Sequence, residues 1–243
     1  MPVASIRDCD CSAGHTGIAI VIGVSGTIGK AVSEHLSAMG VFEAVIGLSR
    51  SGSDPLDLLS EDSIAHSAEQ IAKSGKALRL IFDATGFLHG DGVNPEKTWR
   101  DLNPLAMAHA FAINAIGPAL LMKHFLPRLP RRGRSVFATL SAKVGSIGDN
   151  KLGGWYSYRA SKAALNQLVR TASIELARTH PDAICVALHP GTVASRLSDP
   201  FRKDGLDVVS PDEAAARLVN VVSSLDVSAS GQFLDYRGCP LPW

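Results

Sequence analysis

The sequence lacks the features that mark several classes of protein. No run of lysine and arginine is longer than Arg131-Arg132, and the formal net charge is only +1. Nucleic-acid binders typically carry a basic stripe or a markedly basic domain, so we expect no nucleic-acid partner. The first 16 residues hold no apolar stretch long enough for a signal peptide. The sequence contains no uninterrupted apolar run of about 18 residues, the length that a membrane-spanning helix needs. We therefore expect a cytoplasmic protein without a membrane partner.

Cysteine is scarce, and histidine is scattered. The four cysteines stand at positions 9, 11, 185 and 239. Cys9 and Cys11 have no downstream Cys/His pair to complete a zinc site, and Cys185 lies in an apolar run typical of a buried strand. Reduced thiols are the expected state in a cytoplasmic protein. The eight histidines show no His-Glu-x-x-His spacing, and no Gly-x-Ser-x-Gly elbow occurs. The sequence predicts neither a metal site nor a serine hydrolase.

What is present is an alternation of short β-branched apolar runs with longer helical patterns. The expected strands are 17–22, 44–48, 78–82, 135–140 and 184–188, and the expected helices are 27–39, 63–73, 104–126 and 158–179. Continuous apolar runs suit strands that helices bury on both faces. With no linker to divide the chain, the pattern predicts a single-domain α/β fold. It is a doubly wound parallel sheet over 17–243 that follows an N-terminal tail, 1–16.

The longest expected helix, 104–126, is apolar nearly all round. A surface helix shows one apolar stripe, so this helix needs cover on more than the side that faces the sheet. We infer that it packs against a second subunit beside the helix that follows Tyr158, which makes the protein a homo-oligomer. Burial by a neighbouring helix of the same chain is the alternative.

A glycine-rich turn joins the first expected strand to the first expected helix. It reads Gly23-Val24-Ser25-Gly26-Thr27-Ile28-Gly29. Glycines let backbone turn sharply and approach a pyrophosphate, while the helix that follows offers free N–H groups and a positive dipole end. A glycine turn alone is a weak signal, but this position between strand and helix is typical of a dinucleotide site. A turn without a ligand is the alternative.

The end of the second expected strand indicates which dinucleotide is bound. NAD sites place an acidic residue there for the ribose hydroxyl, whereas NADP sites favour a cation for the 2′-phosphate. The chain has Ser49, Arg50 and Ser51 and no carboxylate. A guanidinium grips phosphate through paired hydrogen bonds, to which Ser49 can add another. NADP is favoured, NAD stays possible, and a solvated loop arginine is the alternative.

Tyr158 and Lys162 stand four residues apart and so share one face of a helix. A free phenol with a pKa near 10 is a poor proton-transfer catalyst at neutral pH. A nearby ammonium, together with an oxidised nicotinamide ring, favours the tyrosinate and lowers that pKa. We therefore expect Tyr158 to transfer the proton and Lys162 to make it acidic. Tyr156 is excluded from this role because Ala160, not lysine, lies four residues beyond it.

From about residue 17 to its end, the chain resembles the short-chain dehydrogenase/reductase family. It is most similar to the branch of C-factor-like carbonyl reductases. The matching segments are the glycine turn, Asn114-Ala115-Ile116-Gly117-Pro118, Ser141 with Gly145, the stretch from Trp155 to Asn166, and Pro190-Gly191-Thr192-Val193. Each falls in the expected order and element. The resemblance implies a Rossmann fold and an oxidoreductase.

The resemblance also implies roles for single residues. Tyr158 protonates a carbonyl oxygen as hydride arrives, Lys162 contacts the nicotinamide ribose, and Asn114 holds a water in the proton path. A serine that binds the substrate oxygen is usually the second of an adjacent pair, but this chain reads Ser141-Ala142. Either Ser141 serves, or Ser146 reaches in from the loop, or no hydroxyl does; we prefer Ser141.

The remaining expected cofactor contacts come from the same resemblance. Pro190, Gly191, Val193 and Ser195 match the turn that binds the nicotinamide carboxamide, and 196–209 is expected to form a substrate lid. The adenine is expected near Asp57 and Leu58. Gly86 ends Asp83-Ala84-Thr85-Gly86, where the family commonly has Asn-Asn-Ala-Gly. The full expected cofactor set is Gly23, Ser25, Gly26, Thr27, Ile28, Gly29, Ser49, Arg50, Asp57, Leu58, Gly86, Pro190, Gly191, Val193 and Ser195.

These features predict an NADP(H)-dependent oxidoreductase. Its expected partner is a small-molecule carbonyl compound or secondary alcohol. The alternative is a signalling or regulatory protein that binds NAD(P) with little turnover, since fold does not guarantee function.

Overall fold

A six-stranded parallel sheet forms the centre of the molecule, in the order β2-β1-β3-β4-β5-β8. The computed structural model describes residues 17–52, 55–90, 92–201 and 207–243; the expected tail 1–16, with Cys9 and Cys11, lies outside the described residues. The strands are β1 Ile18–Ile22, β2 Ala44–Leu48, β3 Leu78–Asp83, β4 Ser135–Leu140, β5 Ala183–His189 and β8 Phe233–Asp235. The expected strands are confirmed to within a residue at each end, whereas β8 was not anticipated.

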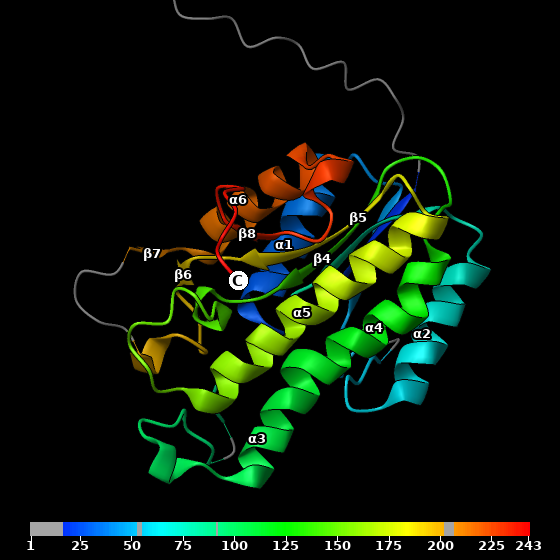
Figure 1. Ribbon diagram of the computed structural model, residues 1–243. Coiled ribbons are helices and arrows are strands. Elements are labelled where there is room, and N and C mark those ends of the chain that lie inside the picture. The colour runs from blue at the N-terminus through cyan, green and yellow to red at the C-terminus, as the bar shows by residue number, and fades with distance from the viewer. Residues whose placement is uncertain (1–16, 53–54, 91, 202–206) are drawn as a thin grey trace, which may run out of the picture.

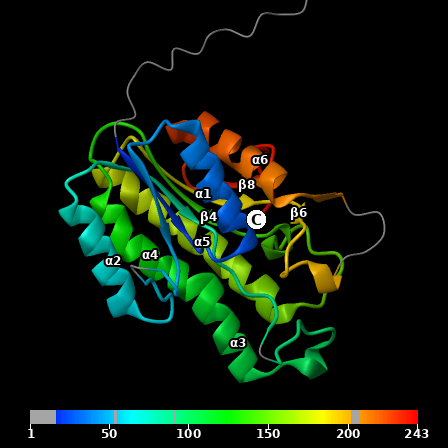
Figure 2. The same ribbon diagram turned by 180° about the vertical axis from the view of Figure 1, so that it is seen from behind.

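Helices cover both faces of the sheet, as the two opposite views show (Figures 1 and 2). The helices α2 Glu61–Lys73, α4 Gly117–Phe125 and α5 Tyr156–Thr179 lie on one face, and α1 Thr27–Met39 and α6 Pro211–Ser224 lie on the other. Helix α6 has no counterpart among the expected helices. This arrangement confirms the doubly wound Rossmann fold.

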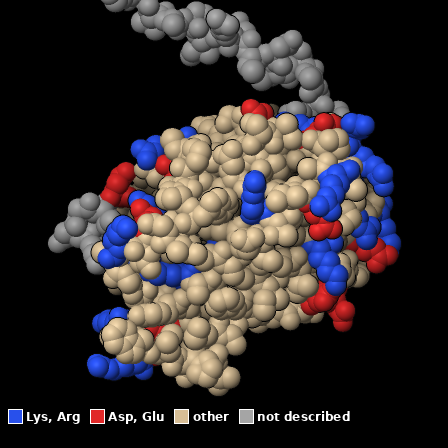
Figure 3. All heavy atoms as spheres, in the orientation of Figure 1, with Lys and Arg blue, Asp and Glu red and all other residues tan. Residues whose placement is uncertain are grey.

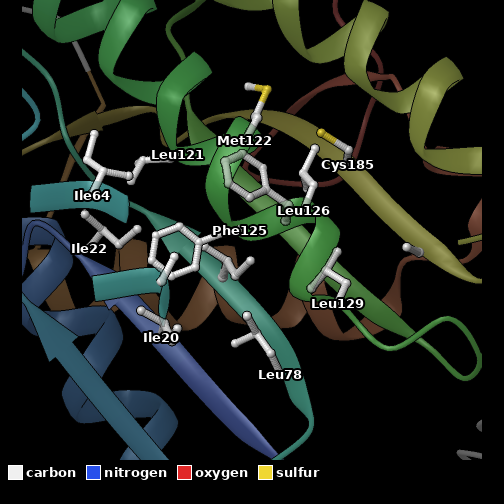
Figure 4. Close-up of a cluster of buried hydrophobic side chains, with 14 of the residues drawn as sticks. Ile20, Ile22, Ile64, Leu78, Leu121, Met122, Phe125, Leu126, Leu129 and Cys185 are labelled. Atoms are coloured by element: carbon white, nitrogen blue, oxygen red, sulfur yellow. The ribbon is translucent and has the colours of Figure 1, made fainter. Parts of the chain in front are cut away.

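Burial follows the position of each strand in the sheet. Every residue of β1 and β4 is buried, which explains their uninterrupted apolar sequence. In the edge strand β2 only Leu48 is buried. Side chains on one side of the sheet form a core with α2, α4 and α5, in which Phe125 lies among Ile20, Ile64 and Leu121 (Figure 4). A second core lies between the sheet and the α1 and α6 helices.

Short elements complete the chain. They are the 3-10 turns η1 Trp99–Asp101, η3 Leu126–Arg128, η4 Lys143–Gly145, η5 Asp199–Phe201 and η6 Val227–Ala229, and the paired strands β6 Thr192–Val193 and β7 Val208–Val209. The expected substrate lid, 196–209, follows β6 and includes η5 and β7. Its residues 202–206 lie outside the described residues.

The long apolar helix is divided in three. Helix α3, Pro104–Phe111, passes through one π-helical turn, η2 Ala112–Ile116, into α4. Helices α2 and α5 pack against α4, so neighbours in the same chain supply part of its cover. Leu105 and Ile116 nevertheless remain 80% and 54% exposed. Few charged side chains lie over the middle of the face that α4 and α5 form (Figure 3). Packing against a second subunit stays a prediction.

By length and composition alone, the stretch Pro104–Arg128 could cross a membrane. Its most apolar window has a mean hydropathy of 1.6, and 39% of that window is buried inside the protein. The expectation that the protein has no membrane span therefore stays a prediction. One such helix is weak evidence, because the core helix of a globular protein meets the same criterion.

Candidate active site

Two positions of the glycine turn disfavour a side chain, one through its backbone conformation and the other through close packing. Gly23 leaves β1 with φ +88°, a conformation that favours glycine. A Cβ on Gly29 would lie 2.3 Å from the Gly23 carbonyl oxygen. The N-cap of α1 is Gly26, so no side chain caps this helix and its first turn holds no acidic residue. Free N–H groups at a positive helix end suit a phosphate.

A first pocket of about 280 Å³ opens from this turn toward β2. We call it the glycine-turn pocket. Its lining includes most of the residues expected around the turn and the adenine: Gly23, Ser25, Gly26, Ser49, Arg50, Asp57, Leu58 and Gly86. Arg50 is exposed at its rim. The Asp57 carboxylate accepts a hydrogen bond from the Leu59 N–H at 3.0 Å, so it also stabilises its own turn. His109 and Ile113 complete the wall and were not anticipated.

A second pocket of about 650 Å³ lies on the other side of the turn. We call it the tyrosine pocket. Its lining includes Thr27 and Ile28 from α1, Ser141, Tyr158 and Lys162 from the expected catalytic set, and Pro190 and Ser195 from the expected carboxamide turn. Both pockets share Ser25, Gly26 and Gly86. The two therefore form one long cleft that bends over the glycine turn, at the carboxyl ends of the strands.

Tyr158 and Lys162 lie one turn apart on α5, and both are buried. The Lys162 ammonium donates a hydrogen bond to the Leu140 carbonyl at 2.8 Å. Burial lowers the pKa of Lys162 to about 8, although the Asp83 carboxylate opposes this change. Burial raises the pKa of Tyr158 to about 12. The expectation that Lys162 makes Tyr158 acidic is therefore not met by the protein alone, because desolvation of the phenol dominates.

Asn114 sits in the π-helical turn and is fully buried. Its amide exchanges two hydrogen bonds of 2.7 Å with the backbone of Phe87 and donates a third to the Ser161 hydroxyl at 3.1 Å. A Cβ on Gly86 would lie 3.6 Å from Lys162 Nζ and 3.7 Å from Asn114 Oδ1. The structure thus brings Asn114, Lys162 and Gly86 together. Local π turns often mark functional sites.

The two candidate serines have other partners. Ser141 donates to Asn166 Oδ1 at 2.6 Å, inside the protein. Ser146 donates to the Trp243 carbonyl at 3.3 Å and accepts from the Asp149 N–H at 3.1 Å, and it does not line either pocket. Ser141 lines the tyrosine pocket, yet its hydroxyl proton points to α5. Its assignment to the substrate oxygen stays a prediction.

Asn166 and Asp83 are site neighbours that sequence reasoning missed as functional. Asn166 lies one turn beyond Lys162, and that spacing was the available signal. Asp83 ends β3 and is fully buried. Its carboxylate accepts hydrogen bonds from the Thr85 backbone N–H at 3.0 Å, from the Thr85 hydroxyl at 2.6 Å and from the Thr139 hydroxyl at 2.7 Å. Asp83 thereby ties β3 to β4 below both pockets, and its burial raises its pKa.

The expected carboxamide turn is only partly in the cleft. Pro190 and Ser195 line the tyrosine pocket. Gly191 has φ +81° and packs against the Tyr236 ring, which a Cβ would approach to 3.0 Å. Val193 is buried in β6, where it pairs with Val209. The Ser195 hydroxyl lies 3.2 Å from that of Ser198. Gly191 and Val193 therefore shape the turn, and contact there falls to backbone and Ser195.

Comparisons with known proteins agree with this geometry. The model of the short chain dehydrogenase family matches residues 17–206. The C-signal protein of Myxococcus xanthus is 36% identical over 145 residues, which cover 59% of this chain and 82% of that protein. A 1-hydroxy-2-glutathionyl-2-methyl-3-butene dehydrogenase of a Rhodococcus species is 31% identical over 189 residues, which cover 77% of this chain and 78% of that enzyme.

A solved structure extends the likeness over nearly the whole chain. The NADPH-bound carbonyl reductase from chicken fatty liver matches with a TM-score of 0.83 and 26% sequence identity, and the match covers 94% of each chain. The fold, the order of the motifs and these relatives confirm the resemblance inferred from the sequence. The chain belongs to the short-chain dehydrogenase family and is an enzyme of that family.

Proposed function

We propose that this protein is an NADP(H)-dependent oxidoreductase that interconverts a small carbonyl compound and a secondary alcohol, with Tyr158 as the proton donor and acceptor. The observation that carries the proposal is that Tyr158 and Lys162 line the cleft that begins at the glycine turn, with Asn114 buried behind Gly86 beside Lys162. The NADPH-bound relative of the same fold supports the cofactor.

The residues of the cleft fit a dinucleotide. Gly29 packs directly against the Gly23 carbonyl, and the α1 helix begins after Gly26 without a side-chain cap, an arrangement that suits a pyrophosphate. Arg50 and Ser49 would hold the 2′-phosphate at the far end of the glycine-turn pocket. Pro190, Ser195 and Lys162 would contact the nicotinamide riboside half. When bound, NADPH supplies the hydride.

The chain's own residues handle the proton. Burial raises the pKa of Tyr158 to about 12 and keeps the phenol protonated at neutral pH, and the Lys162 ammonium would offset this burial by favouring the tyrosinate as the phenol donates its proton to a carbonyl oxygen. The O–H bond of Tyr158 breaks and a new O–H bond forms on the product alcohol. The Lys162 ammonium then stabilises the tyrosinate until a proton returns from solvent. The reverse steps describe alcohol oxidation.

The proposal is tested by following NADPH oxidation against a panel of ketones, aldehydes and quinones. Turnover of at least one carbonyl compound is expected. Tyr158→Phe should keep NADPH affinity and lose about 10²–10⁴-fold in rate, because that is what a positioned proton donor typically contributes. Equal rates for the parent and the variant would overturn the role of Tyr158.

A signalling or regulatory protein that binds NADP with little turnover is the second candidate. Two observations favour it: the Ser141 hydroxyl is engaged with Asn166, and a relative at 36% identity carries the name C-signal. Tight NADPH binding without turnover of any carbonyl compound on the panel would support this candidate over the first.

We also propose that a second copy covers the face over α4 and α5. A groove of about 470 Å³ runs between these helices and is lined largely by apolar side chains, among them Met122, Leu126 and Leu168. Ile116 and Ile174 remain more than half exposed nearby. Ile174→Asp should lower the molar mass measured by light scattering if this face pairs. The cytoplasmic location expected from the sequence likewise stays a prediction.

A further inference from the structure

The helix that carries Tyr158 begins in an unusual conformation. Gly153, Gly154 and Trp155 have φ of +64°, +65° and +53°, three left-handed residues in a row. Among the described residues, Trp155 is the single non-glycine residue with positive φ. A side chain makes this conformation unfavourable, because Cβ approaches the following carbonyl oxygen. Such backbone persists where its surroundings hold it, and it often lies at functional sites.

Glu96 accepts hydrogen bonds from two residues of this turn, Trp155 and Ser157. Its backbone carbonyl accepts a hydrogen bond from the Trp155 N–H at 2.5 Å. Its carboxylate accepts one bond from the Ser157 N–H at 3.1 Å and another from the Ser157 hydroxyl. Glu96 is only 6% exposed, although it belongs to the connection between β3 and η1. Three hydrogen bonds therefore fasten one buried glutamate to the start of α5.

These bonds replace a cap that α5 does not supply for itself. The first N–H groups of a helix have no partner inside the helix. Trp155, at the N-cap position, contributes no side-chain hydrogen bond, and the first turn of α5 contains no acidic residue. Glu96 provides both the acceptor and the negative charge that favour this end of the helix, from 61 positions away in the sequence.

The same connection reaches the catalytic group at two points. Its first residues include Phe87, whose backbone holds the Asn114 amide. Tyr158 directly follows Ser157, and its ring lies edge to face against the Trp155 ring, with 6.2 Å between centroids. A shift of Glu96 would therefore move Ser157, which directly precedes Tyr158, and Trp155, whose ring packs against it.

We propose that Glu96 is a positioning residue for Tyr158: it caps α5 from another segment and thereby fixes where the phenol hydroxyl stands in the cleft. The inference rests on the proposed function, because such placement affects the rate only if Tyr158 transfers the proton. Misplacing a reacting group by about 1 Å can cost about 10²-fold in rate. Glu96 acts through Tyr158 and does not itself touch the substrate.

The test separates kcat from cofactor binding. Glu96→Ala should lower kcat by about 10- to 100-fold while the Kd for NADPH stays within about twofold of the parent. Glu96→Gln should recover most of the rate, because its amide oxygen still accepts from the Ser157 N–H.

Asp226→Ala is the matched control. Asp226 also accepts from the N–H and the hydroxyl of a single serine, Ser228, at the start of η6. It lies in neither pocket, so this variant should keep full kcat. An equal loss of kcat in Asp226→Ala would mean that losing any such cap slows the enzyme, and the inference would be wrong.

A double-mutant cycle decides whether Glu96 acts through Tyr158. In the Tyr158→Phe background, Glu96→Ala should add no further loss of kcat. Independent, multiplying losses would overturn the inference and leave the proposed function intact, whereas full activity of Tyr158→Phe alone would overturn both. If Glu96→Ala does not fold, Ser157→Ala removes one of the two donors to the carboxylate and should also lower kcat. An unchanged kcat in that variant would count against Glu96.

Discussion

The two pockets of the cleft are built in different ways. The glycine-turn pocket begins at a turn packed so closely that a Cβ on Gly29 would lie 2.3 Å from the Gly23 carbonyl oxygen. The tyrosine pocket depends on side chains from α5 and the end of β4, held by single hydrogen bonds such as that from Lys162 to the Leu140 carbonyl. NADPH binding at the glycine turn should therefore be sensitive to added atoms, and catalysis in the tyrosine pocket to the removal of charged or hydrogen-bonding groups.

Adding one methyl group to the turn should have the largest effect. Gly29→Ala places a Cβ 2.3 Å from the Gly23 carbonyl oxygen, so the turn must open and the phosphate-facing N–H groups must move. We expect NADPH affinity to fall by about 100-fold or more, as loss of about two hydrogen bonds to a charged group implies. Isothermal titration calorimetry measures this. The control Ser37→Ala, at the other end of α1, should bind NADPH as the parent does. Normal NADPH binding by Gly29→Ala would show that the close packing of the turn is not needed to bind the cofactor.

The same contrast explains what could be predicted from the sequence. Strands β1 to β5 follow from continuous apolar runs, and the turn from glycine spacing, since both depend on neighbours in the chain. Tyr158, Lys162 and Asn114 are predicted from spacing and family resemblance, and their roles stay predictions. Asn166 and Glu96 were missed as functional neighbours, because their roles come from hydrogen bonds that span 25 and 61 positions. The high pKa of Tyr158 was missed for a similar reason: burial depends on the whole fold.

Arg50 tests the end of the glycine-turn pocket where the 2′-phosphate is expected. Arg50→Ala removes the guanidinium expected to bind the 2′-phosphate. Hydrogen bonds to charged groups contribute about 1.5–3 kcal/mol, which corresponds to a 10- to 100-fold rise in KM for NADPH. KM for NADH should change little, because NADH has no 2′-phosphate. Steady-state kinetics with both cofactors measures the ratio, and equal effects on both would show that Arg50 does not discriminate between them.

The value of kcat/KM for carbonyl reduction should depend on pH through the charge of Lys162 in the tyrosine pocket. Lys162, with a pKa of about 8, loses its charge above that pH, whereas Tyr158, with a pKa of about 12, stays protonated. We therefore expect kcat/KM to fall about tenfold per pH unit above pH 8. Lys162→Arg should lose this decline, because a guanidinium stays charged. A decline that persists in Lys162→Arg would belong to another group.

Stability should change in the opposite direction over the same pH range. The folded pKa of Lys162 lies below its ordinary value of 10.5, so between pH 8 and 10.5 the unfolded chain binds more protons at this position. The contribution of Lys162 to the free energy of unfolding therefore rises with pH in this window. Denaturant titrations of the parent and of Lys162→Met at pH 8 and pH 10 isolate that contribution. If activity were instead lost through general unfolding, kcat/KM and the free energy of unfolding would fall together above pH 8.

The smallest expected effect lies at the Asp83 carboxylate, directly before Ala84 and Thr85, which line both pockets. Thr139→Val keeps the shape of the side chain but removes its donor to Asp83 Oδ2, which leaves a buried carboxylate oxygen without that hydrogen bond. Loss of one partner of a buried polar group costs about 1–3 kcal/mol in the free energy of unfolding. NADPH affinity should change little, because Thr139 lines neither pocket. Urea unfolding measures the loss, with the exposed Thr171→Val as the control; equal stability of the two variants would mean that Asp83 does not depend on Thr139.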